Sequence, residues 1–285
     1  MGEREVGLMA YERQGETPLD YMPCRYGMSK LLFRGPRRSL SGRYAAFLGG
    51  TETYGKFIAR PFPSLIETRT GVKCINFGWP NAGIDAFLHD PEVLSAAAGA
   101  RAVVLQVPPA QNMSNRFYRV HPRRNDRFVE ASPMLRAIFN EVDFTEFHFT
   151  RHMLSRLRDQ SLDRFALVRD ELQAAWLARM RMLIERINAP VVLLWLSAHE
   201  MRRDAGMPDL IEDPAFVTRG MIKALMPMVR SVVDATASAE AMQAGARGMV
   251  HSDFEATVAS ELLGPQVHQE TAARLGPVIE ELVNA

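Results

Sequence analysis

Five short apolar runs constrain the fold more than any other feature of the sequence. Each is rich in Val, Ile, Leu or Phe, and none alternates strictly between apolar and polar residues. Such runs are typical of parallel strands that helices cover on both faces of a sheet. The sequence therefore predicts strands at residues 44–48, 72–77, 102–107, 190–196 and 229–234.

Helical segments are predicted between these strands. Residues 163–188 contain no Gly or Pro, and their apolar side chains recur every three or four residues, which predicts a long amphipathic helix. Shorter helices are predicted over residues 91–100 and 269–283. Because strands alternate with helices, the expected fold is α/β, a three-layer sandwich around a five-stranded parallel sheet. The predicted buried face of the long helix consists of Phe165, Val168, Leu172, Trp176, Met180, Leu183 and Ile187.

Two stretches lie outside this minimal pattern. Residues 1–43 are rich in Pro and Gly and predict an N-terminal arm, whereas residues 44–285 form a single α/β domain. Residues 108–189 separate the third and fourth strands and predict a long insertion on the ligand side of the sheet. Within the arm, the basic piece 34–38 is either a solvated loop or a cover that supplies contacts to an anion.

Composition and charge restrict the class of protein. The chain has 285 residues and a formal net charge of +1, which does not suggest a nucleic-acid partner. No stretch approaches 18 uncharged apolar residues, so no membrane association is expected. Cys24 and Cys74 fit neither a zinc site nor a disulfide scaffold. We expect a soluble, reduced, cytoplasmic protein without a cofactor.

The turn after the first strand, residues 49–56, supports more than one chemistry. It places Thr51 at the carboxyl end of a strand, where α/β sheets bind ligands. Its glycines fit a nucleophile turn with Thr51 in place of serine. The segment from Gly50 to Lys56 also fits Gly-x-x-x-x-Gly-Lys, a phosphate loop, although Phe57 occupies the position of the expected hydroxyl. As a third alternative, Thr51 only caps the following helix.

Four stretches in the right order resemble the SGNH (GDSL-type) hydrolases. They are residues 49–55 after the first strand, 76–85 after the second, 109–115 after the third and 264–268 before the last helix. The resemblance implies a flavodoxin-like fold and acyl transfer. It implies that Thr51 is the nucleophile, His268 the base, and Gly83 and Asn112 donors to the oxyanion.

The chain also departs from the pattern of that superfamily. Gly50 replaces the aspartate that precedes the nucleophile, and Pro265 stands where a carboxylate would orient the histidine. Asp253 or Glu270 could replace that carboxylate. The whole chain is similar to an uncharacterised bacterial family with an SGNH-like core, mainly through residues 115–118 and 120–127.

A basic cluster follows the third strand. Arginine binds carboxylate, phosphate or sulfate through two parallel hydrogen bonds, so the cluster predicts recognition of an anionic ligand. Alternatively, it is a solvated loop that pairs with acids such as Asp143 and Glu146. His148 and His152 share a helical face but lack an acidic third ligand at helical spacing, so no metal site is predicted. The cluster comprises Arg116, Arg119, His121, Arg123, Arg124 and Arg127.

The leading functional hypothesis is an SGNH-like ester hydrolase or acyl transferase that acts on an anionic small molecule or saccharide. One alternative is a non-catalytic module that binds an anionic ligand on a degenerate SGNH fold. Another is a transferase that uses a nucleotide or sulfonucleotide through the segment from Gly50 to Lys56.

Overall fold

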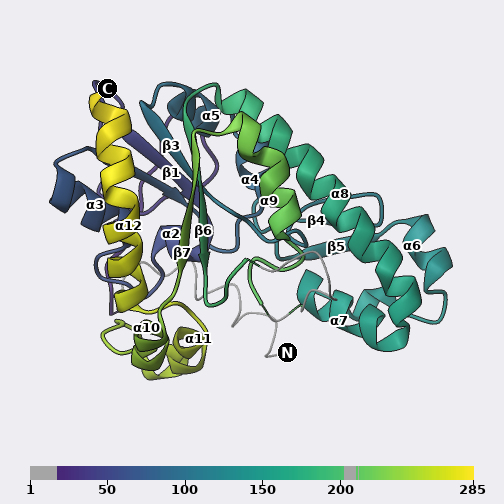
Figure 1. Cartoon of the computed structure of the whole chain (residues 1–285). Helices are drawn as coiled ribbons and strands as arrows, with labels where there is room; N and C mark the ends of the chain where they lie inside the picture. Colours follow the sequence, from purple (N-terminus) through teal and green to yellow (C-terminus); the bar gives the residue numbers. More distant parts are fainter. Residues whose placement is uncertain (1–17, 202–209, 211) are drawn as a thin grey trace.

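The computed structural model describes residues 18–201, 210 and 212–285. Five parallel strands form one sheet in the order β2-β1-β3-β6-β7, with helices on both faces (Figure 1). The predicted strands agree with the observed ones to within two residues at each end, and the three-layer α/β fold is confirmed. The strands are β1 (Ala45–Gly49), β2 (Cys74–Gly78), β3 (Ala102–Gln106), β6 (Val191–Ser197) and β7 (Ser231–Thr236).

Successive side chains of a strand point to opposite faces, and the sheet uses both faces to build its core. In β1, Ala46 and Leu48 join one apolar cluster, whereas Ala45 and Phe47 join the other. This burial on both faces explains why the strands read as continuous apolar runs in the sequence.

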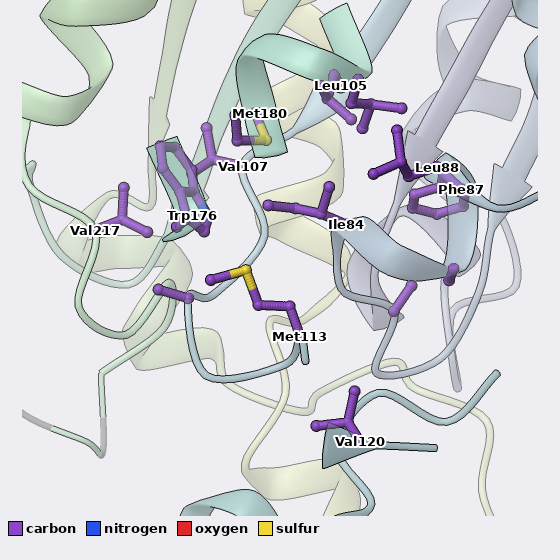
Figure 2. Packing of buried hydrophobic residues seen from close by; sticks show 14 of the residues in the cluster. Ile84, Phe87, Leu88, Leu105, Val107, Met113, Val120, Trp176, Met180 and Val217 are labelled. Carbon is purple, nitrogen blue, oxygen red and sulfur yellow. The ribbon is translucent and has the colours of Figure 1, made fainter. Parts of the chain in front are cut away.

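The larger cluster lies between the sheet and the long helix α8 (Leu162–Ile187). All seven predicted face residues of α8 are buried, which confirms the predicted periodicity. Trp176 and Met180 of α8 lie in one cluster with Ile84 and Val107 (Figure 2), and the Trp176 indole donates to the Pro108 carbonyl at 2.9 Å. The same face carries α4 (Ile84–Leu88), α5 (Pro91–Ala98), α9 (Arg219–Leu225) and the short η2 (Met226–Met228).

Two helices cover the opposite face. They are α3 (Phe62–Thr70) and the C-terminal α12 (Pro265–Asn284), which lie together on the far side of the sheet from α8 (Figure 1). Both carry a proline within the first two positions of the helix, where no backbone N–H is needed for an intrahelical bond.

The predicted insertion after the third strand is confirmed. Its antiparallel pair, β4 (Tyr118–Val120) and β5 (Phe128–Ala131), precedes α6 (Pro133–Ile138), η1 (Phe144–Glu146) and α7 (Thr150–Gln160), which leads into α8. At the carboxyl edge of the sheet, β1 is followed by α2 (Thr51–Tyr54). After β7 come α10 (Ala239–Ala244), η3 (Asp253–Glu255) and α11 (Ala256–Ser260). None of the described helices is long and apolar enough to span a bilayer.

The described part of the N-terminal arm, residues 18–43, packs against the edge of the sheet at β2. Phe33 is buried with its ring centroid 5.1 Å from that of Phe77. Arg34 is also buried, and its guanidinium donates to the carbonyls of Tyr54, Gly55 and Ala59. This guanidinium therefore stabilises the end of α2 through backbone carbonyls.

A buried asparagine of the insertion secures the first turn of α4. Asn125 Oδ1 accepts from the N–H groups of Gly83 and Ala86 at 2.9 and 3.1 Å, and its Nδ2 donates to the His121 carbonyl at 3.0 Å. The side chain is completely buried. The Asn125 side chain thus acts as the N-cap of α4, although it is distant from α4 in the sequence. The N-cap residue itself, Gly83, has no side chain that could accept these bonds.

Replacing this asparagine should destabilise the protein strongly. In Asn125→Ala, two buried N–H groups lose their acceptor, so we expect the free energy of unfolding in urea to fall by about 2–4 kcal/mol. The control, Arg119→Ala, removes an exposed ion pair with Glu130 in the same insertion and should cost less than about 1 kcal/mol. Equal losses in the two variants would contradict this role of Asn125.

Candidate functional site

A cavity of about 1110 Å³ opens at the carboxyl edge of the sheet. Its lining comes from the segments after β1, β2, β3 and β6, from α7 of the insertion and from residues 258–263. We call it the carboxyl-edge cavity. Its position agrees with the general location of ligand sites in open α/β sheets.

Gln106, the last residue of β3, organises the turn after β1. Its Oε1 accepts from the N–H groups of Gly50 and Thr53 at 3.1 and 3.2 Å and from the Thr53 hydroxyl at 2.5 Å. Its Nε2 donates to Glu52 at 2.9 Å. A Cβ on Gly49 would lie only 2.1 Å from the Thr53 hydroxyl, so this close packing requires glycine. The sequence-based prediction missed Gln106, although a polar residue that closes a buried strand was a usable signal.

Thr51 lines the carboxyl-edge cavity as predicted from the topology. Its hydroxyl accepts from the N–H of Asn81 at 3.1 Å and donates to Asn81 Oδ1 at 3.2 Å. Asn81 Nδ2 in turn donates to Asp126 at 3.1 Å. Among the described residues, no histidine forms a hydrogen bond with the Thr51 hydroxyl. In this arrangement the Thr51 hydroxyl bonds to Asn81 and not to a described histidine, which is the contact that an activated threonine nucleophile would make.

His268 lies in α12, which covers the face of the sheet opposite α8. It does not line the carboxyl-edge cavity. It is 2% exposed, its ring stacks on that of Phe62 with centroids 5.8 Å apart, and its Nδ1 accepts from the Phe62 N–H at 3.2 Å. Burial, with a smaller effect of Arg34, lowers the pKa of His268 to about 3. The histidine therefore stays neutral and caps α3.

The two predicted oxyanion donors lie next to each other, but they differ in their access to the cavity. A Cβ on Gly83 would fall 1.6 Å from the Asn112 carbonyl oxygen. The Gly83 N–H is bound to Asn125, and Gly83 does not line the cavity. Asn112 does line it, and its Oδ1 accepts from the Thr150 hydroxyl at 3.2 Å. Of the four predicted catalytic residues, Thr51 and Asn112 thus reach the cavity.

The two residues that could replace the missing carboxylate also lie apart from the imidazole. Glu270 accepts from the N–H and the hydroxyl of Ser238, and Asp253 stands in η3. Neither forms a described contact with His268.

The basic cluster of the insertion does not line the carboxyl-edge cavity. Arg116 bonds to Glu171 at 2.8 Å, Arg119 pairs with Glu130 at 3.0 Å, and Arg127 lies 4.1 Å from the ring centroid of Phe149. The pairing partners of Arg116 and Arg119 are thus acids other than the expected Asp143 and Glu146. Recognition of an anion by this cluster stays a prediction.

His121 has a structural role within the same cluster. Its Nδ1 accepts from the backbone N–H groups of Arg123 and Arg124, each at 3.2 Å. Burial and the neighbouring arginines lower the pKa of His121.

The segment from Gly50 to Lys56 is a helical turn and does not have the form of a phosphate loop. The N–H groups of Tyr54, Gly55 and Lys56 bond to the carbonyls of Gly50 and Thr51 within the turn. These three N–H groups cannot also surround a phosphate. The Lys56 ammonium lies 4.7 Å from the ring centroid of Phe57 and outside the cavity lining. This geometry disfavours the nucleotide hypothesis.

The lining of the cavity is acidic. Among the described residues that line the cavity, the only arginine is Arg151, which bonds to Asp213 at 2.8 Å. Burial raises the pKa of Glu52, and Asp213 adds to that rise by repulsion. Burial also raises the pKa of Asp126. The described lining also includes two histidines, His152 and His199, and its carboxyl groups are those of Glu52, Asp126, Glu212, Asp213 and Glu261.

Comparison with protein families matches residues 9–283 to a domain of unknown function, DUF6473. The chain belongs to the DUF6473 family. No curated protein sequence matches it.

Solved structures resemble the DUF6473 chain in outline. A lipase, Lip_vut3 from a goat rumen metagenome, is 12% identical, and the match covers 82% of this chain and 96% of the lipase with a TM-score of 0.40. A family two carbohydrate esterase from Cellvibrio japonicus is 10% identical, with 89% and 64% coverage and a TM-score of 0.38. Likeness at this level assigns no activity to the chain.

The neutral His268 should make the stability of the protein sensitive to acid. Its pKa is about 3 when folded and near 6.5 when unfolded, so the unfolded chain takes up a proton first as the pH falls. The contribution of the neutral His268 to the free energy of unfolding is therefore complete above pH 6.5. It falls by up to about 1.4 kcal/mol per pH unit as the pH decreases toward 3. We expect the free energy of unfolding to fall more steeply between pH 7 and 5 in the wild type than in His268→Asn, which keeps an acceptor for Phe62. Parallel pH profiles of the two proteins would refute this role.

Proposed function

We propose that the protein is a binding module whose carboxyl-edge cavity holds a polar small molecule that is neutral or positively charged, such as a polyol or saccharide. One observation carries the proposal. The described lining residues of the cavity carry five carboxyl groups and one arginine, Arg151, which is bonded to Asp213. Carboxylates accept hydrogen bonds from hydroxyl and amino groups, whereas they repel phosphate, sulfate and carboxylate.

The state of Thr51 supports binding over acyl transfer. Serine-type catalysis needs a hydroxyl whose proton a base can remove, together with an oriented histidine and donors for the oxyanion. Here the Thr51 hydroxyl already accepts a hydrogen bond from the Asn81 N–H and donates one to Asn81 Oδ1. His268 is buried beside Phe62, and the Gly83 amide is bound to Asn125.

An ester hydrolase or acyl transferase remains the second candidate, because Thr51 and Asn112 share the cavity with His152 and His199. In that mechanism the Thr51 hydroxyl would attack an acyl carbonyl, and Asn112 would stabilise the oxyanion. Thr51 would first have to leave Asn81, and a histidine would have to approach it.

The binding proposal predicts a ligand-dependent rise in melting temperature. Glucose or glycerol should stabilise the protein at millimolar concentrations, because binding to the folded state alone shifts the unfolding equilibrium. Inorganic phosphate at the same ionic strength should not. Ala198→Trp places a large side chain in the lining and should abolish the shift, whereas Ala98→Trp on the exposed side of α5 should preserve it. A shift that survives in Ala198→Trp would place the ligand elsewhere.

The two candidate functions differ in what Thr51 does to an activated ester. We expect p-nitrophenyl acetate to be hydrolysed at the same background rate by the wild type, Thr51→Ala and Thr51→Ser, because no base among the described residues is hydrogen-bonded to the hydroxyl. Saturable turnover that Thr51→Ala abolishes and Thr51→Ser raises would instead support the hydrolase.

A further inference from the structure

A buried amide oxygen in the carboxyl-edge cavity lacks a hydrogen-bond partner. Gln111 follows β3, lines the cavity and is 2% exposed. Its Oε1 accepts no hydrogen bond from any described residue, while its backbone carbonyl accepts from the Tyr118 hydroxyl at 2.7 Å. Native proteins rarely leave such an acceptor unsatisfied, and a functional role is one explanation when they do.

His199, after β6, presents a second acceptor to the same cavity. Its Nδ1 lies 3.0 Å from the Glu200 carbonyl, which can only accept, so Nδ1 carries the proton. In the neutral ring, Nε2 then holds a lone pair. This atom is buried without a hydrogen-bond partner among the described residues, and Glu212 Oε2 lies 3.7 Å from it.

The segments that carry these groups are hydrogen-bonded to one another. Strands β3 and β6 are neighbours in the sheet. The Ala110 N–H donates to the Ala215 carbonyl at 3.0 Å, and the Ser197 hydroxyl donates to the Asp213 carbonyl at 2.7 Å. These bonds join the segments that carry Gln111, His199 and Glu212, and we call these three lining residues the acceptor side.

We propose that the acceptor side binds a primary ammonium group of the ligand. An ammonium offers three N–H donors, no acceptor and a positive charge. It therefore satisfies the Gln111 oxygen and the His199 lone pair, and Glu212 supplies the opposite charge. This inference rests on the proposed function, and it narrows the ligand class to amines such as amino sugars or amino alcohols.

The test compares two small probes that differ only in this group, ethanolamine and ethylene glycol. Binding to the full-length chain is followed by ligand-observed NMR at constant ionic strength. Ethanolamine should bind at least about tenfold more tightly, because hydrogen bonds to charged groups are the stronger ones. Equal affinity for the two probes would overturn the ammonium site but leave the binding function intact. If neither probe binds, both proposals are overturned.

Variants of Gln111 separate recognition from structure. Gln111→Met keeps the size of the side chain but removes the oxygen, and it should weaken ethanolamine at least about tenfold. Gln111→Glu should strengthen it. Because Oε1 satisfies no described donor, the ligand-free Gln111→Met protein should melt no lower than the wild type. A lowered melting temperature together with unchanged ethanolamine affinity would assign Gln111 a structural role and overturn the proposal.

Two matched charge variants locate the ammonium. Glu212→Gln removes a carboxylate of the acceptor side, whereas Glu261→Gln removes one contributed by the segment after α11. We expect the first to weaken ethanolamine several-fold more than the second, because an ion pair depends on distance. Equal effects would indicate a general attraction to the acidic lining and would refute a local site.

Discussion

The side-chain amide of Gln106 is the constraint on which the candidate site depends. Its Oε1, at the end of β3, accepts three hydrogen bonds from the turn after β1, and its Nε2 donates one to Glu52. Because β1 and β3 are neighbours, this contact joins two loops at one edge of the sheet. It fixes which side chains of the turn face the cavity, and it leaves no space for a side chain at Gly49.

The fold was largely predictable because burial on both faces of a parallel sheet restricts each strand to apolar residues. The same reasoning identified α8, whose buried side chains follow the helical period from Phe165 to Ile187. Topology alone also placed Thr51 at the carboxyl edge, since the carboxyl ends of parallel strands meet there, and the resemblance to the SGNH hydrolases added Asn112. These features follow from local patterns that hold wherever the chain forms such a sheet.

The roles of polar side chains were less predictable because they depend on partners distant in sequence. Arg116 bonds to Glu171, which lies 55 residues away, and the separation between His268 and Phe62 is 206 residues. A histidine near a helix start can face the sheet edge or the neighbouring helix, and packing decides between them. The acidity of the described lining was not predictable for the same reason, because the whole chain is nearly neutral while the acids of the cavity come from four separate segments.

The indole of Trp195 links the buried end of β6 to the cavity. Its Nε1 donates to the His199 carbonyl at 3.0 Å, and its ring lies 5.8 Å from that imidazole. Indole emission responds to hydrogen bonding and to nearby charge, so any shift of His199 should change the fluorescence of Trp195. The chain has three tryptophans, and Trp79 and Trp176 bond to carbonyls in other segments. The protein therefore carries an intrinsic optical reporter for occupancy of its own cavity.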